Sequence, residues 1–393
     1  MTTPASASAW KMLGVVSLAQ FLGMTLWFSA TAITPRLIAE YDISPGHAAW
    51  LTMAVQAGFV AGTLISAVAN LADVVNPRVL MCIGSLAGAI ANAAVLFAPG
   101  GASVIALRFL TGASLALVYP PGMKIAAGWF RDGRGFALGM LIGALTLGKA
   151  FPHLLTALFG AEWRQPMVLV SLLAAIGGTL VLAIVRDGPY VAATAPFDPQ
   201  AIRKVLASRG ARLATLGYLG HMWELYAMWT WVAVFAAASF AASGMADADA
   251  AGSVAAFLAI GSGAAGCVLA GYIADRVGKA RVAMWAMLAS AASAALTVVV
   301  FGQSPILLYA LIMFWGFAVV ADSAQFSALV SEHAPRDHVG TALTLQTCAG
   351  FLLTMVTIEA LPRVAAAGGW QFASLLLVPG PLLGAWAMAR LAK

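Results

Sequence analysis

The sequence predicts an all-α membrane protein with twelve transmembrane helices, and its composition is the first reason. Hydrophobic residues make up 62% of the 393 residues and charged residues only 9%, whereas a soluble domain carries about 25% charged residues. So little charge cannot cover a water-facing surface of this size, so most of the chain must face lipid. The apolar stretches are unbroken rather than alternating, which favours helices over a β-barrel. Disordered chains, disulfide-rich secreted domains and nucleic-acid-binding proteins are excluded on the same numbers.

Stretches long enough to cross a bilayer as a helix, about 20 apolar residues, occur twelve times along the chain. The predicted spans are 10–33, 47–72, 79–98, 103–127, 135–158, 167–185, 212–239, 250–273, 281–301, 305–330, 339–361 and 370–391. Most connectors are short, but residues 186–211 form a long one that separates six spans from six. We therefore expect two pseudo-symmetric six-helix bundles, 1–185 and 212–393, joined by a cytoplasmic linker.

The linker, 186–211, is expected to contain a short helix that lies on the membrane surface. Asp198 is suited to cap the start of this helix and Gly210 to end it. We expect its basic residues to face headgroups or water: Arg203, Lys204 and Arg209.

The distribution of lysine and arginine outside the spans predicts the orientation of the chain. If the N-terminus is inside, the outer side holds only Arg36, Arg164 and Arg363, and the other cations outside the spans lie inside. This bias places both termini in the cytoplasm. The short loops and the abundance of Gly and Ala suggest a multi-pass protein of a bacterial inner membrane.

Three loose sequence matches indicate that the second half repeats the first. ALRFLTG (106–112) matches ALIMFWG (310–316) at an offset of 204, and RDGRGFAL (131–138) matches RDHVGTAL (336–343) at 205. LADVVNPRV (71–79) echoes IADRVGKARV (273–282) at about 202. A nearly constant offset is typical of transporters built from a duplicated six-helix unit.

The loop between the eighth and ninth spans carries the clearest motif. It contains Gly271, Asp275, Arg276, Gly278 and Lys279, and this pattern resembles the GxxxDRxGR/K loop of the major facilitator superfamily. Arg108-Phe-Leu-Thr-Gly112 is similar to that family's RxxxG motif in the fourth span. With twelve spans and a duplicated pattern, the resemblance covers the whole chain. It implies a transporter rather than an enzyme.

The matching loop of the first half keeps Asp73 and a cation, Arg78, but lacks both glycines. By resemblance, the two loops form a gate that holds the cytoplasmic side shut in one conformation. Asp275 would pair with an arginine or face a helix N-terminus, Gly271 would allow close helix packing and Gly278 a tight turn. The alternative is a solvated loop whose charges only orient the chain.

The seventh span is the most informative one for function. His221 and Glu224 are three residues apart and share a helix face, and Glu224 falls near mid-membrane. Because ionisable groups in hydrocarbon mark ion or substrate pathways, Glu224 is the first candidate for proton coupling. The alternative is a fixed ion pair with Arg108 or Lys149. Aromatic residues of the same span offer stacking surfaces for a substrate: Tyr226 and Trp229.

Other polar residues within spans complete the predicted substrate and proton pathway. In the tenth span, Asp322 and Gln325 lie too close together for a lipid-facing surface and are expected to line a cavity. In the fifth span, Lys149 needs either a carboxylate partner or an anionic substrate. Arg108 has the same two possibilities, contact with substrate or a structural role.

The fourth span contains Tyr119-Pro120-Pro121. Proline removes an amide donor and its ring clashes with the preceding turn, so we expect a kink beside Tyr119 near the cavity.

The sequence thus predicts a secondary active transporter that moves a small polar or anionic metabolite by alternating access. We expect transport to be driven by protons, through symport or antiport. We also expect the protein to be a monomer, with a small-molecule substrate and the lipid bilayer as its partners. The three cysteines are dispersed in apolar segments, and no cofactor or metal site is expected. An exporter of hydrophobic compounds is the alternative. It is disfavoured because the fifth span lacks the proline of the drug–proton antiporter pattern. A membrane sensor that transports nothing is a remote alternative.

Overall fold

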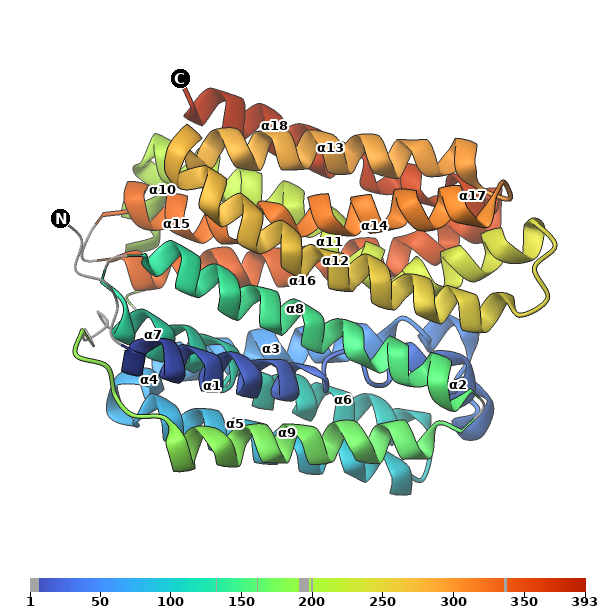
Figure 1. Ribbon diagram of the computed structural model, residues 1–393, viewed down its shortest axis with the longest axis horizontal. Helices are drawn as coiled ribbons and strands as arrows, with labels where there is room; N and C mark the ends of the chain where they lie inside the picture. Colours follow the sequence, from blue (N-terminus) through green and yellow to red (C-terminus); the bar gives the residue numbers. More distant parts are fainter. Residues whose placement is uncertain (1–6, 132, 161, 191–197, 199–200, 336–337) are drawn as a thin grey trace. The chain divides into compact units, whose positions relative to one another are not determined.

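The computed structural model describes residues 7–131, 133–160, 162–190, 198, 201–335 and 338–393. Within these ranges, the side chains of Pro45, Ala72, Asp73 and Ala201 are not described. Every regular element in the described ranges is a helix, and the helices of each half lie side by side along the horizontal axis of Figure 1.

Eleven helical segments of the described chain are long and apolar enough to cross a membrane. In the first half they are α3 (Trp50–Val68), α5 with η3 (Pro77–Phe97), α6 (Gly101–Leu115) with α7 (Tyr119–Trp129), α8 (Arg134–Phe159) and α9 (Arg164–Ile184). In the second half they are α11 (Arg209–Ala242), α12 (Ala248–Val277), α13 (Lys279–Val300), α14 (Pro305–Ala321) with α15 (Ser323–His333), α16 (Val339–Gly368), and α17 (Trp370–Ala373) with η5 (Ser374–Leu377) and α18 (Pro379–Leu391). These segments coincide with the second to twelfth predicted spans.

The first predicted span, 10–33, is not one continuous helix. α1 (Ala7–Met24) ends early and is followed by turns over residues 25–30, then by η1 (Thr31–Ile33) and α2 (Thr34–Tyr41). α1 is the one predicted span that does not meet the length and apolarity of the other eleven. Hydrophobicity alone did not reveal the break, because residues 25–30 include apolar and aromatic side chains.

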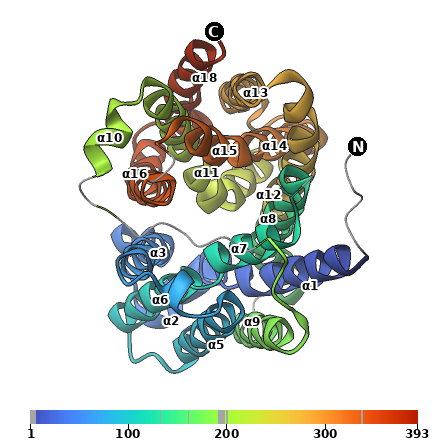
Figure 2. The same ribbon diagram turned by 90° about the vertical axis from the view of Figure 1, so that its left-hand side faces the viewer.

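By their contacts, the helices group into two compact units. In the first unit, α3 packs on α6, α6 on α5, α5 on α9 and α9 on α1, while α7 contacts α1 and α5. Figure 2 shows this arrangement along the helix axes. In the second unit, α11 contacts α12, α16 and α18, and α13 joins α14 to α18. Residues 153–160, at the end of α8, group with the second unit.

Glycines bring the same helices together in both halves. A methyl group on Gly112 of α6 would collide with the carbonyl oxygen of Val55 in α3, and one on Gly316 of α14 would collide with that of Ala259 in α12. Both partners of the second contact lie 204 residues after those of the first. The same offset relates a further pair of contacts: Gly62 with Ala113, and Gly266 with Phe317. The offset seen in the sequence thus recurs in the packing.

The fourth and tenth spans are interrupted at corresponding positions. α6 ends at Leu115 and α7 begins at Tyr119, as the prolines predicted. Pro120 and Pro121 have no amide hydrogen for the carbonyls four residues earlier. In the tenth span Asp322 separates α14 from α15, and it lies 204 residues after Val118, the last residue before α7.

The linker differs in one respect from its prediction. It contains α10 (Ala201–Ala207), whose Arg203 and Lys204 are exposed, as is Arg209. Gly210 does not end this helix but lies inside α11. The reason is local: the side chain of Ser208 accepts a hydrogen bond from the amide of Ala211 at 3.3 Å and starts the next helix. Asp198 is described but not in a helix, and residues 199–200 lie outside the described chain.

Candidate functional site

Arg108 is held at the break in the first span. Its side chain is completely buried. Nη2 donates to the carbonyl oxygens of Leu26 at 2.9 Å and Trp27 at 2.7 Å, and Nη1 donates to Ser29 Oγ at 3.0 Å and Asn92 Oδ1 at 2.7 Å. The two bonds to backbone carbonyls replace helix bonds that residues 25–30 lack. Of the three guanidinium nitrogens, Nε alone has no hydrogen-bond partner among the described residues.

Asn92 of α5 extends this network. Its Oδ1 also accepts from Ser29 at 2.6 Å, and its Nδ2 donates to Ser171 Oγ of α9 at 3.0 Å. The guanidinium therefore ties the first span to α5 and α9 through hydrogen bonds that a substrate would have to displace. This geometry favours the structural alternative for Arg108.

Lys149 of α8 is 3% exposed, and its ammonium lies 4.0 Å from the centroid of the Trp27 ring. The Trp27 ring packs against Phe59 of α3, with ring centroids 5.1 Å apart and planes at 60°. A cation over an indole face is stabilised by the ring quadrupole. The ammonium of Lys149 and the ring of Phe59 thus both lie beside Trp27 at the unwound end of the first span.

Two glutamines of the first unit are buried without hydrogen-bond partners. Gln20 of α1 and Gln56 of α3 are both 0% exposed, and neither the nitrogen nor the oxygen of either carboxamide bonds to a described residue. Leaving a buried polar group unpaired costs about 1–3 kcal/mol. The carboxamide oxygen of Gln20 lies against Gly122 of α7.

In the second unit, Glu224 of α11 is 1% exposed and receives two hydrogen bonds. Its Oε1 accepts from Ser290 Oγ of α13 at 2.8 Å and from Trp315 Nε1 of α14 at 2.6 Å. Among the described residues, the other carboxyl oxygen accepts no hydrogen bond. The carboxyl group therefore has neutral donors on one oxygen, and the second oxygen is available to hold a proton.

His221, one turn before Glu224, contacts the break in the tenth span. Its Nδ1 lies 2.8 Å from Asp322 Oδ1 and its Nε2 lies 3.0 Å from Ser323 Oγ. Both His221 and Asp322 are 2% exposed. The structure thus brings together the three titratable residues that the sequence singled out in the seventh and tenth spans.

The remaining pathway candidates lie in different surroundings. The ring of Tyr226 packs against Trp229 at 5.3 Å and against Phe351 of α16 at 5.1 Å, forming a buried aromatic cluster. Gln325 is buried in α15, one turn after Asp322. Tyr119 is half-buried at the first position of α7.

The predicted gating loop of the second half lies between α12 and α13. Gly278 has φ +96° and ends one helix while starting the next. Lys279 pairs with Glu332 of α15 at 2.7 Å, and Arg276 stacks on the ring of Tyr272. Asp275 is exposed and makes no ion pair with any described residue, and Gly271 lies one turn earlier in α12.

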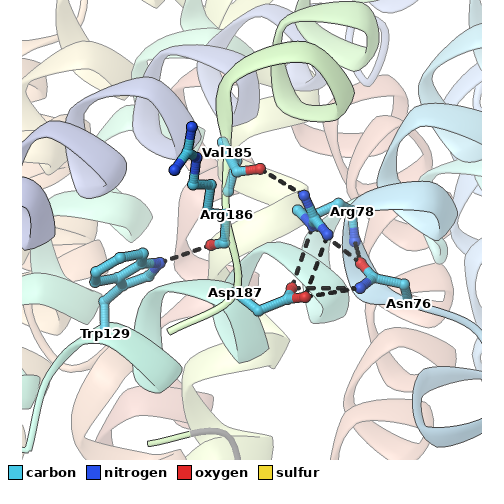
Figure 3. A network of polar contacts seen from close by, with 6 residues as sticks. All are labelled: Asn76, Arg78, Trp129, Val185, Arg186 and Asp187. Atoms are coloured by element: carbon cyan, nitrogen blue, oxygen red, sulfur yellow. Dashed lines mark hydrogen bonds and ion pairs between the residues drawn. The ribbon is translucent and has the colours of Figure 1, made fainter. Parts of the chain in front are cut away.

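In the first half, Arg78 contacts an aspartate that the sequence analysis did not consider. Its Nε lies 3.1 Å from Asp187 Oδ1 and its Nη1 donates to the carbonyl of Val185 at 2.7 Å (Figure 3). Asn76 joins the network by donating to Asp187 at 3.1 Å. The side chain of Asp73 lies outside the described residues. Arg78 therefore ties the start of α5 to the segment after α9.

Comparison of the sequence with protein-family profiles shows the family to which the chain belongs. The profile described as Major Facilitator Superfamily matches residues 16–356. The chain belongs to the major facilitator superfamily. It is therefore a multi-pass membrane transporter of the secondary type, with a small-molecule substrate and no enzymatic activity, as predicted.

Solved structures agree on the fold of this transporter. It is similar to the crystal structure of a mutant of the nucleoside transporter NupG, with a TM-score of 0.72 and 14% identity over 97% of this chain and 100% of that one. At this identity the likeness shows the fold alone. A search of curated proteins finds no match.

Sequence reasoning missed several residues that complete the polar sites of this superfamily member. They are Trp315 and Ser290 beside Glu224, Asn92 beside Arg108, and Asp187 beside Arg78. The donors to Glu224 lie 66 and 91 residues away in the chain, so no local spacing could have connected them. Trp315 is within an almost entirely apolar run and Ser290 within an alanine-rich one, and neither carries a polar signal.

Proposed function

We propose that this transporter moves a small polar or anionic solute across a bacterial inner membrane and is driven by protons. As a monomer, it would work by alternating access between two halves, 1–185 and 212–393, joined by the linker 186–211. Both termini would lie in the cytoplasm, on the side that the lysine and arginine bias favours. Glu224 carries the coupling proton, and His221 with Asp322 forms a second titratable pair one helical turn away.

The geometry of Glu224 is the observation that supports this proposal best. A buried carboxyl group that must bind and release a proton needs an environment that tolerates both forms. Ser290 and Trp315 both donate to Oε1. A proton can therefore sit on the other oxygen without breaking either bond. Neutral donors also stabilise the carboxylate without the permanent neutralisation that a lysine or arginine would impose.

The pair His221 and Asp322 gives the coupling site a connection to helix movement. Asp322 lies between α14 and α15, so a change in its contact with His221 accompanies any change in the angle between these two segments. Proton transfer at Glu224 changes the electrostatic field at this pair, because His221 lies one turn away on the same helix and contacts Asp322. Protonation and conformation are linked in this way.

Glu224→Gln tests the coupling role. Glutamine keeps the shape of the side chain and an oxygen that accepts from Ser290 and Trp315, but it cannot take up a proton. A substrate is first found by a thermal-shift screen of metabolites at two pH values. The variant, reconstituted in proteoliposomes, should then lose accumulation driven by an imposed proton gradient, while substrate exchange stays measurable.

Glu359→Gln is the matched control. Glu359 of α16 pairs with Arg363 on the same helix and is 25% exposed, so the change should leave gradient-driven accumulation intact. Unchanged accumulation in Glu224→Gln would remove the coupling role from this residue.

An exporter of hydrophobic compounds by proton antiport is the second candidate, and one feature favours it. An apolar pocket in the second unit is bordered by Trp231, Phe235, Trp315 and Trp370. A resistance assay with a broad panel of hydrophobic drugs separates the two candidates. Nucleosides enter the metabolite screen only as one class among others, because the likeness to NupG extends to the fold alone.

A further inference from the structure

Gln56 occupies a defined place opposite the break in the first span. Four residues before it on α3, Thr52 shares a 2.7 Å hydrogen bond with Thr31, and three residues after it, Phe59 packs on Trp27. Residues at these spacings share one helix face. The carboxamide therefore lies on the face of α3 that meets the stretch between Trp27 and Thr31.

The carboxamide of Gln56 is completely buried, and neither polar atom bonds to a described residue. Buried polar side chains nearly always have partners, supplied by protein, water or a ligand. Thr52 and Thr31 on the same face form a hydrogen bond with each other, whereas the carboxamide of Gln56 has no partner among the described residues.

A cation lies at the same place. The ammonium of Lys149 is 4.0 Å from the centroid of the Trp27 ring, which also packs against Phe59. A lysine ammonium carries three N–H donors and a glutamine carboxamide two, against a single acceptor oxygen. The cluster is thus rich in donors, positively charged and bounded by two aromatic rings. A carboxylate has the complementary charge and the acceptors, and an apolar body suits the rings.

We propose that Gln56, Lys149, Trp27 and Phe59 form the recognition site for a small organic carboxylate, which specifies the substrate class of the function proposed above. The carboxylate oxygens accept from the Lys149 ammonium and the Gln56 amide, and the organic group packs against the two rings. All four side chains are at most 3% exposed. The site is therefore closed in this conformation and opens to water in another state of the transport cycle.

The test uses the purified full-length transporter and pairs of ligands that differ only in charge. Benzoate and butyrate are compared with benzamide and butyramide by thermal shift and by calorimetric titration. Each carboxylate should bind at least about tenfold more tightly than its amide, because charge-assisted hydrogen bonds are about twice as strong as neutral ones. Gln56→Leu and Lys149→Met should each remove most of this preference.

Gln20→Leu is the matched control for replacing a buried glutamine. Gln20 is as buried and as unpartnered as Gln56. It lies in α1, before the break, and its carboxamide oxygen lies against Gly122 of α7. This variant should keep the carboxylate preference. If Gln56→Leu does not fold, Gln56→Glu takes its place in the test. Glutamate has nearly the same shape as glutamine, and its negative charge should repel the carboxylate.

Three results would overturn the assignment: amides that bind as well as carboxylates, no response to any of the carboxylates, or equal losses in Gln20→Leu and Gln56→Leu. Failure of the proton-coupling proposal is a separate result. Proton-driven transport of a solute without a carboxylate would leave coupling intact and refute this site. Carboxylate binding without gradient-driven accumulation would do the reverse.

Discussion

Arg108 shows what makes a charged side chain acceptable inside a span. Four hydrogen bonds to Leu26, Trp27, Ser29 and Asn92 surround its guanidinium. Two of the acceptors are backbone carbonyls that a helix would otherwise satisfy internally. The charge is thus balanced by local dipoles, and the unwound stretch after α1 gains donors that lipid cannot supply.

Replacing Arg108 by leucine should therefore destabilise the transporter by about 3 kcal/mol or more, since several charge-assisted hydrogen bonds are lost at once. The check is the thermal unfolding midpoint in detergent. Arg164→Gln is the control, because Arg164 pairs with Glu40 at a half-exposed position, where an ion pair contributes at most about 1 kcal/mol. An Arg108 variant with an unchanged midpoint but no substrate binding would show that the residue belongs to the binding site instead.

The residue candidates in the second unit were predictable in kind but not in arrangement. Spacing alone placed His221 and Glu224 on one helix face. It could not show that His221 contacts Asp322 or that Glu224 contacts Trp315, because those partners come from other helices about 100 residues away in the chain. The role of each residue depends on these partners.

At the scale of elements, the interruptions of the spans have different causes. Pro120 and Pro121 predict the break between α6 and α7 from the sequence, because proline has no amide hydrogen to donate to the helix hydrogen bonds. The breaks after Met24 and at Asp322 carry no such signal. They are accompanied by tertiary contacts instead, from Arg108 to Leu26 and Trp27 and from His221 to Asp322.

The repeated glycine contacts give a second prediction at this scale. Gly112→Ala and Gly316→Ala should both lower the unfolding midpoint, by similar amounts, because each added methyl group collides with a backbone carbonyl of the neighbouring helix. Gly14→Ala in α1 is the control, since no neighbouring atom lies within 4 Å of the added methyl group, and alanine should raise helix stability slightly. A loss in only one of the two halves would mean that the contacts are not equivalent.

At the scale of the whole molecule, the charge bias predicts which side of the membrane each loop faces. All three natural cysteines, Cys82, Cys267 and Cys348, are buried. Labelling of a single introduced cysteine can therefore be measured with little background from them. In intact cells, Arg36→Cys should react with an impermeant maleimide, and Arg203→Cys should react only after the membrane is opened. Both positions are exposed in the structure.

The opposite labelling pattern would invert the orientation and remove the argument from the positive-inside bias. Labelling of both positions in intact cells would contradict a cytoplasmic linker. The unsubstituted transporter, whose three cysteines are buried, gives the background, and a denatured sample of each variant gives the full signal.

The sequence by itself determined that most of the chain faces lipid, the helical class, eleven of the spans and a duplication at an offset of about 202 to 205 residues. These follow from composition, hydrophobic length and repeated spacing, which are local properties of the chain. Tertiary structure alone decided where α1 ends, that Arg78 contacts Asp187, and which donors surround Glu224. Such contacts join helices that are distant in sequence, and in an apolar interior each polar group is satisfied by whichever partner the packing brings within reach.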